Sequence, residues 1–452
     1  MRAGSNQLVP GWAEAPPAAS LTNLVLAPLL AVSRLTSQLF ILMLAIFLFR
    51  PPDVDLYQLD RVALGLLVIA CLVRAVLLRK QLWPATPLVW PMLVLCSLAV
   101  LTTLGQPYNA QTWSLMAAKF LVPYALYYFA GIVFDTPASL RHLETFLLVT
   151  LAYLSFTAIA QLLGWDLLVF PRFILDPSIG IHVDRARGPF LQAVANGVVL
   201  NVLGLVALDC YRRGRLRGLL GILLLSALPI AILATMTRAV WLSFAGSIVW
   251  IGLSTRGALR KATLALAGVA VLGLLISLAT PNQQNALADR AGEQGPIEIR
   301  VAIYRAALGM AVERPLLGWG VNQMPREVVR RVEGYHLEAY WAHNSYLEIL
   351  VENGLLGLTL YVSIAVGLFR ASRMSKRPGK GSDERWDNTL AGDGLRSLWP
   401  VLVCVYLFNA CFVVMNYQFV NALIFTLAGI LAARHEAPER RTHASAVVAA
   451  QA

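Results

Sequence analysis

The chain has few charged residues for its length. Asp, Glu, Lys and Arg make up only 14% of its 452 residues, whereas about a quarter of the residues are charged in an ordinary soluble domain. The hydrophobic fraction is 58%, and the mean hydropathy is +0.65. This composition excludes an ordinary soluble domain and predicts a protein embedded in a membrane.

Three further features are scarce or missing. The cysteines all fall in apolar stretches at no metal-ligand spacing, so we interpret them as small core residues; they are Cys71, Cys96, Cys210, Cys404 and Cys411. Residues 1–20 lack the basic and apolar regions of a cleavable signal peptide, so we expect none. The net charge of +12 is not interleaved with aromatic residues in a basic groove, so we expect no nucleic-acid partner.

Long apolar runs are what the chain has in abundance. Runs near 20 residues recur throughout, and each can cross about 30 Å of hydrocarbon. We predict an all-α polytopic membrane protein with about 12 transmembrane helices, over residues 35–50, 62–78, 86–104, 117–134, 146–164, 191–210, 218–236, 239–254, 262–279, 345–369, 397–415 and 419–433. Residues 21–33 are expected to form a separate interfacial or re-entrant helix.

The predicted organisation has three parts. Residues 1–279 hold the first nine helices, residues 280–344 form one long loop that contains helices and polar motifs, and residues 345–452 hold the last three helices and a tail. Matching short spans broken by glycine or proline, which transporters often carry in their two halves, are not seen.

The basic residues orient the predicted bundle. Lys and Arg concentrate in the loops at 79–80, 212–217, 256–261 and 370–396, whereas the turns at 105–116 and 414–418 hold none. The positive-inside rule then places both termini in the cytoplasm and the loop 280–344 on the outer face.

Basic side chains that remain at the outer face need another explanation. Arg185 and Arg187 precede the sixth span, Arg238 lies in the short connection before the eighth, and Arg300 belongs to the long loop. Lys119 lies near the outer end of the fourth span. Because a guanidinium donates two parallel hydrogen bonds to phosphate oxygens, the cluster is suited to a lipid diphosphate. The competing explanation is that individual arginines reach lipid phosphates or pair with glutamate.

Three other features are candidates for chemistry. His343 directly precedes an apolar helix, and a histidine at a membrane face can act as a general base near neutral pH. Gly318 and Gly320, with Asn322, suit a tight turn that exposes backbone N–H groups. Asp53 and Asp55 could hold a metal ion, but we favour a solvated loop as the explanation for this pair.

Several of these segments resemble the O-antigen ligase and polymerase family of bacterial envelope glycosyltransferases. The resemblance rests on Arg300 with Tyr304, on Pro315-Leu-Leu-Gly-Trp-Gly-Val-Asn322, on His343-Asn-Ser-Tyr-Leu347 and on Glu352-Asn-Gly-Leu-Leu-Gly357. Thr237-Arg238 and the segment Arg185-Ala-Arg-Gly-Pro-Phe190 with Asn196 are also similar to family motifs. The family's usual Pro-Asn pair is replaced here by Ala195-Asn196.

The resemblance implies an enzyme that works without a metal or other cofactor. It implies His343 as the catalytic base, with Arg185, Arg238 and Arg300 on the diphosphate. Arg187 and Lys119 are the second choices for binding it. Gly318, Gly320, Asn322 and Asn344 are the expected supports of the site.

The resemblance also implies the substrates and the location. The donor would be a glycan on undecaprenyl diphosphate, at the periplasmic face of the bacterial inner membrane among membrane lipids. A ligase transfers the glycan to a lipid A core, a polymerase to another glycan, and a related oligosaccharyltransferase to a protein. Polymerases of the family often carry an arginine and a glycine separated by ten residues, and none of the outward arginines here has a glycine at that spacing. We therefore favour a ligase. A transporter or flippase of lipid-linked sugars and a metal-dependent glycosyltransferase using Asp53 and Asp55 stay as alternatives.

Overall fold

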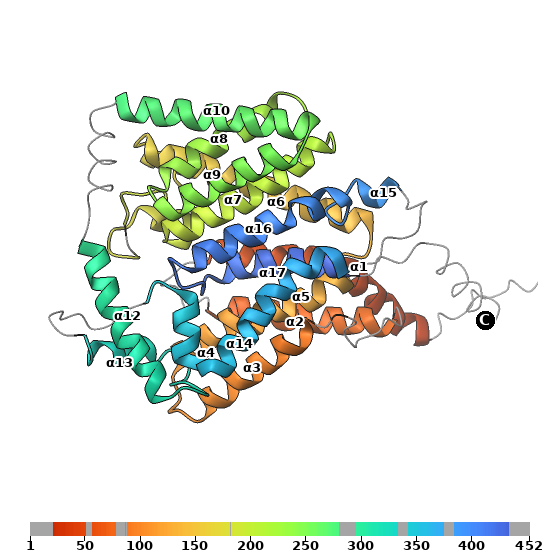
Figure 1. The fold of residues 1–452 in the computed structure, drawn as a ribbon. Coiled ribbons are helices and arrows are strands. Elements are labelled where there is room, and N and C mark those ends of the chain that lie inside the picture. The colour runs from red at the N-terminus through yellow and green to blue at the C-terminus, as the bar shows by residue number, and fades with distance from the viewer. Residues whose placement is uncertain are drawn as a thin grey trace, which may run out of the picture.

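The computed structural model describes residues 21–50, 57–77, 86, 88–180, 182–279, 295–332, 342–374 and 384–433. Every regular element in these ranges is a helix, and they contain no strand (Figure 1). The prediction of an all-α fold is therefore confirmed for this part of the chain.

Helices lie along the predicted spans. They are α1 (Leu21–Leu48), α2 (Tyr57–Leu77), α3 (Val89–Leu104), η1 (Ala117–Leu121) with α5 (Val122–Val133), α6 (Pro137–Leu162), α7 (Ala193–Arg212), α8 (Leu219–Ala234), α9 (Arg238–Ser254), α10 (Gly257–Ala279), α14 (Ser345–Met374), α16 (Asp393–Ala410) and α17 (Gln418–Ala432). Helix α4 (Ala110–Met116) was not predicted; it lies in the expected turn 105–116 and leads directly into η1. The shorter ones are η2 (Asp166–Leu168), η3 (Arg172–Leu175), η4 (Gly188–Phe190) and α15 (Glu384–Asp387), and α12 (Gly295–Glu313) and α13 (Met324–Val329) lie in the predicted loop.

A helix lies at each of the twelve predicted positions, but their lengths differ. Among the described residues, five helical stretches are long and apolar enough to cross a membrane: Ala110–Val133, Pro137–Leu162, Ala193–Arg212, Gly257–Ile276 and Ser345–Arg373, the last with a kink at Gly354. Five further apolar helices have 10–17 residues. A multi-pass membrane protein is thus confirmed, and the number of twelve spans stays a prediction.

One predicted boundary is wrong. Residues 21–33 do not form a separate helix, because α1 runs without interruption from Leu21 to Leu48. The junction Ser33-Arg34-Leu35 contains neither glycine nor proline, so nothing in the local sequence ends the helix there.

Two helices form the centre of the bundle. Helices α7 and α17 are buried along nearly their whole length, and they pack against α5, α6, α8, α14 and α16 (Figure 1). A helix that is apolar all round is suited to such a central position. Gly429 permits a close contact between α17 and α5, because a Cβ there would lie 2.1 Å from the backbone oxygen of Tyr127.

At one end of the bundle, arginines form ion pairs with buried carboxylates. At the end where α6 begins and α7 terminates, Arg213 and Arg215 bind the buried Glu144 at 2.6 and 2.7 Å. Arg213 also binds Asp209 at 2.8 Å. These arginines, expected in a cytoplasmic loop, neutralise carboxylates that would otherwise be buried and unpaired.

Candidate active site

The site lies where α12 and α13 pack against the first turns of α14, at the end of the bundle that also holds α3 and α4 (Figure 1). Its frame is the segment 315–322, which runs alongside an interrupted turn of α14. The N–H groups of Trp319 and Gly320 donate to the carbonyls of Val351 and Glu352 at 2.9 and 2.8 Å, and Leu355 N–H donates to Pro315 O at 2.7 Å.

Two glycines permit this backbone-to-backbone contact. Gly318 has φ +71°, and a Cβ there would lie 2.5 Å from the carbonyl carbon of Glu352. Gly354 breaks α14 with φ +66°, and a Cβ there would lie 2.2 Å from Leu316 O. Both positions therefore need glycine for conformation and for space. The glycine-rich turn is therefore braced against α14.

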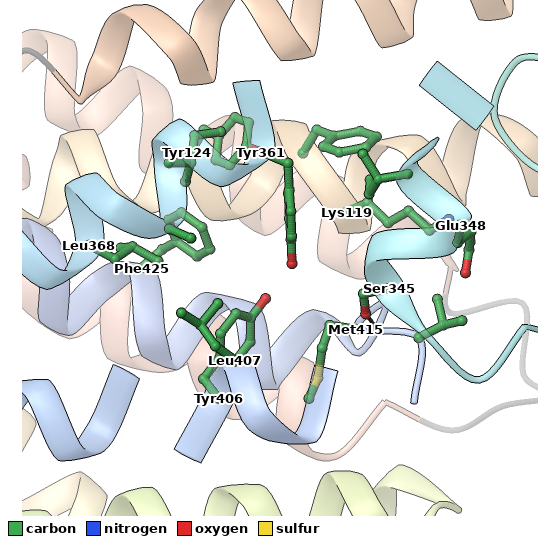
Figure 2. A pocket seen from close by; sticks show the side chains of 15 residues that line it. Lys119, Tyr124, Ser345, Glu348, Tyr361, Leu368, Tyr406, Leu407, Met415 and Phe425 are labelled. Carbon is green, nitrogen blue, oxygen red and sulfur yellow. Dashed lines mark hydrogen bonds and ion pairs between the residues drawn. The ribbon is translucent and has the colours of Figure 1, made fainter. Parts of the chain in front are cut away.

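A buried ion cluster fixes the same turn of α14. Lys119 projects from the π-helical turn η1 and pairs with Glu348 (Figure 2). It also pairs with Glu352 at 3.0 Å. Glu352 Oε1 also accepts the N–H of Asn322 at 2.6 Å, and Asn322 Nδ2 donates to Thr112 Oγ1 at 3.1 Å. The cluster thus ties η1, α14 and the segment 315–322 together.

The two glutamates were missed as a pair from the sequence. They are spaced i, i+4 on one face of an otherwise apolar span, and charged residues at such depth require a partner. That spacing was the available signal.

A small cavity of about 30 Å³ lies beside Glu348 and is bordered by Tyr361, Tyr406 and Ser345 (Figure 2). It has room for about one water molecule.

His343 is held in an uncommon backbone conformation. Its φ is +48°, a left-handed value that histidine adopts more readily than most residues. The next residue, Asn344, caps α14, since its Oδ1 accepts the N–H groups of Tyr346 and Leu347 at 3.0 and 3.1 Å. Ser345 Oγ then donates to Val413 O at 2.9 Å, which anchors the start of α14 to the turn after α16.

The surroundings of His343 favour its neutral form. Burial lowers the pKa of His343 below its ordinary value, and the positive charge of Arg300 and the nearby His182 lower that pKa further. A neutral imidazole is the form that accepts a proton, so the arrangement suits a base at neutral pH.

The segment carrying Arg185 is attached next to Arg238. Ala186 N–H donates to Ala234 O, the last residue of α8, at 3.0 Å. Asn196 Nδ2 donates to Ala186 O at 2.8 Å. Gly188, with φ +56°, allows the close contact with Asn196. Arg185 and the α8–α9 connection with Arg238 therefore lie on the same side of the bundle.

The remaining predicted arginines differ in their partners. Arg238 is the exposed first residue of α9, and Arg300 is half-buried on α12. Within the described ranges, neither has a carboxylate within 4.0 Å, in contrast to Arg213 and Arg215. Arg185 lies 3.9 Å from the exposed Asp184.

The two second choices are engaged in structural contacts. Arg187 is fully buried, and its guanidinium donates to the carbonyls of Ile174, Asp176 and Ile179. The guanidinium of Arg187 therefore holds backbone carbonyls of the preceding loop together, and these donors are not turned toward a ligand. Lys119 is committed to the two glutamates described above. Asp53, Asp55 and His336 lie outside the described residues.

A comparison with protein families finds a match that covers part of this site. Residues 220–362 match the family model of the O-antigen ligases. The match confirms the resemblance seen in the sequence and supports a member of the O-antigen ligase and polymerase superfamily. The matched region includes Arg238, Arg300 and His343, whereas Arg185 precedes it. No curated protein matches the chain.

Proposed function

We propose that this member of the superfamily is an O-antigen ligase, which transfers a glycan from undecaprenyl diphosphate to a sugar hydroxyl of a lipid A core. The observation that supports this proposal best is the neighbourhood of His343: a histidine held neutral, with Arg300 close to it. The transfer needs a proton acceptor for the acceptor hydroxyl and a positive charge for the leaving diphosphate, and His343 with Arg300 would supply both.

The acceptor half of the reaction would use His343. Its unprotonated ring nitrogen takes the proton of the acceptor hydroxyl as that oxygen bonds to the anomeric carbon. The bond between the anomeric carbon and the diphosphate oxygen breaks at the same time, and its electron pair leaves with the diphosphate. A single displacement of this kind inverts the anomeric centre.

The donor half would use Arg185, Arg238 and Arg300. Their guanidinium groups neutralise the charge that grows on the leaving diphosphate, as preorganised cations do for other oxyanions. Arg187 and Lys119, which are paired within the protein, would hold the site in place. The positions of Gly318, Gly320, Asn322 and Asn344 give them the same supporting role.

A transfer assay with two acceptors tests the proposal. Purified protein is given undecaprenyl-diphosphate glycan with either a lipid A core or an acceptor protein, and the mass of each acceptor is measured. A gain by the lipid A core supports the ligase, a gain by the protein indicates an oligosaccharyltransferase, and a longer glycan on the donor lipid indicates a polymerase. No product in detergent with both substrates present would favour a transporter or flippase.

A chelator separates this proposal from a metal-dependent one. With the arginines supplying positive charge, transfer should continue in excess chelator, and the double variant Asp53→Ala, Asp55→Ala should stay active. Loss of activity that magnesium or manganese restores would move the site to the loop with Asp53 and Asp55.

A further inference from the structure

An apolar groove on the outside of the bundle runs between α9 and α16. It has a volume of about 290 Å³ and is lined by Leu242, Gly246 and Trp250 on α9 and by Val401, Cys404 and Phe408 on α16. The groove is open to the outside of the bundle, since Leu242 and Trp250 are 63% and 57% exposed. A Cβ atom added at Gly246 would meet no other atom within 4 Å.

The two serine hydroxyls that line the groove are hydrogen-bonded within the protein. Ser243 Oγ donates to Val240 O at 2.9 Å and accepts from Asn201 and Asn409 at 3.2 and 3.0 Å. Ser247 Oγ donates to Ser243 O at 2.8 Å. The groove consequently offers hydrocarbon rather than hydrogen bonds, and a ligand with an apolar chain fits this surface.

The groove is aligned with one of the proposed diphosphate-binding residues. Arg238, Leu242, Gly246 and Trp250 are spaced i, i+4, i+8 and i+12, so they form one stripe along α9. Arg238 stands at the head of that stripe. At 1.5 Å per residue, the lining from Leu242 to Trp250 extends about 12 Å along the helix.

We propose that this groove holds the first part of the polyprenyl chain of the lipid-diphosphate donor, with Arg238 at its head group. The inference rests on the proposed function for the identity of the donor. It adds a recognition element within the membrane that distinguishes long prenyl chains from short ones. Ordinary acyl chains of the bilayer would also meet this surface, but they lack a diphosphate that Arg238 can hold at the head of the stripe.

Filling the groove tests the assignment. Gly246→Leu places a side chain in the groove, and Gly252→Leu is the matched control, because Gly252 lies on the same helix outside the groove lining and also has no atom near an added Cβ. The dissociation constants of undecaprenyl diphosphate and geranyl diphosphate are measured for wild type and both variants in detergent.

Gly246→Leu should weaken binding of undecaprenyl diphosphate about tenfold, which corresponds to roughly two displaced methylene groups. Binding of geranyl diphosphate should change less than twofold, and Gly252→Leu should change neither. Equal weakening for both lipids, no weakening, or the same effect from Gly252→Leu would overturn the inference.

A second measurement uses the unmodified protein. Cys404 borders the groove and is exposed, so its alkylation by a membrane-permeable maleimide can be followed by peptide mass spectrometry. Undecaprenyl diphosphate should slow this alkylation several-fold more than geranyl diphosphate, and equal rates would contradict the proposal even if Gly246→Leu did not fold. Binding with protection but without transfer to any acceptor would instead leave the groove assigned and refute the proposed function.

Discussion

Replacing Lys119 by methionine should destabilise the protein strongly. The Lys119 side chain is 6% exposed, as is that of Glu348, and Glu352 is completely buried. Methionine keeps most of the length and removes the charge, so the two carboxylates would face each other without a cation. Removing one partner of a buried ion pair typically costs about 3–5 kcal/mol.

The effect is large enough to measure in a thermal melt. At roughly 2 °C per kcal/mol for a large chain, the Tm should fall by roughly 6–10 °C. Because large proteins often unfold irreversibly, all variants are compared at one scan rate in one detergent. Arg330→Ala is the control, since its pair with Glu327 at 3.1 Å is exposed and such pairs contribute about 0–1 kcal/mol.

A compensating variant separates charge from packing. Lys119→Met with Glu348→Gln and Glu352→Gln leaves no uncompensated charge, so it should recover more than half of the lost Tm. A single Lys119→Met variant that melts within 2 °C of wild type would refute the view that this cluster ties α14 to the bundle. So would a triple variant that melts lower than the single one.

Other expected outcomes follow from the same geometry. The kcat/KM of transfer should fall with decreasing pH only below about 6.5, the ordinary pKa of histidine, because the unprotonated His343 is the active form and its pKa is lowered. His182→Gln should shift this acidic decline of kcat/KM to higher pH, because it removes one of the charges that lower the pKa of His343. An unchanged pH profile would remove His182 from the site. Asn344→Ala should lose an N-cap worth about 1 kcal/mol and lower kcat with little change in KM, whereas Asn344→Ser should retain most of both. In cells with a permeabilised outer membrane, Arg330→Cys should react with an impermeant thiol reagent and Arg256→Cys should not; the opposite pattern would invert the predicted topology.

The helices could be predicted from the sequence because each is a local property. An apolar run of sufficient length specifies a span wherever it occurs in the chain, and the twelve runs each correspond to a helix. The predicted start of α1 was wrong because the helical segment 21–33 leads into the apolar segment 35–50 with no helix-breaking residue between them. The ends of helices depend on single residues and are less strongly specified.

The contacts within the site depended on pairs that are distant in sequence. Lys119 and Glu352 are 233 residues apart, so nothing local to either residue indicated the pairing. Gly318 suggested a turn, whereas Gly354 lay within the predicted helix 345–369. Only the structure shows that Gly354 interrupts this helix and that each glycine makes room for the other's segment. In the same way, the sequence made Arg187 a second choice for the diphosphate beside Arg185, whereas in the structure its guanidinium is bound to three carbonyls.

The division between a base and a diphosphate clamp is the central claim. It is tested by measuring donor affinity and turnover for His343→Ala, Arg238→Ala and Arg300→Ala in detergent, with a thermal melt for each variant. His343→Ala should bind the lipid diphosphate within about twofold of wild type and lose about 10²–10⁴-fold in turnover. The arginine variants should lose affinity as well, by the roughly 1.5–3 kcal/mol of a charge-assisted hydrogen bond, and lysine should restore it only in part. Full turnover by His343→Ala, or a loss of donor affinity as large as that of Arg238→Ala, would contradict the account.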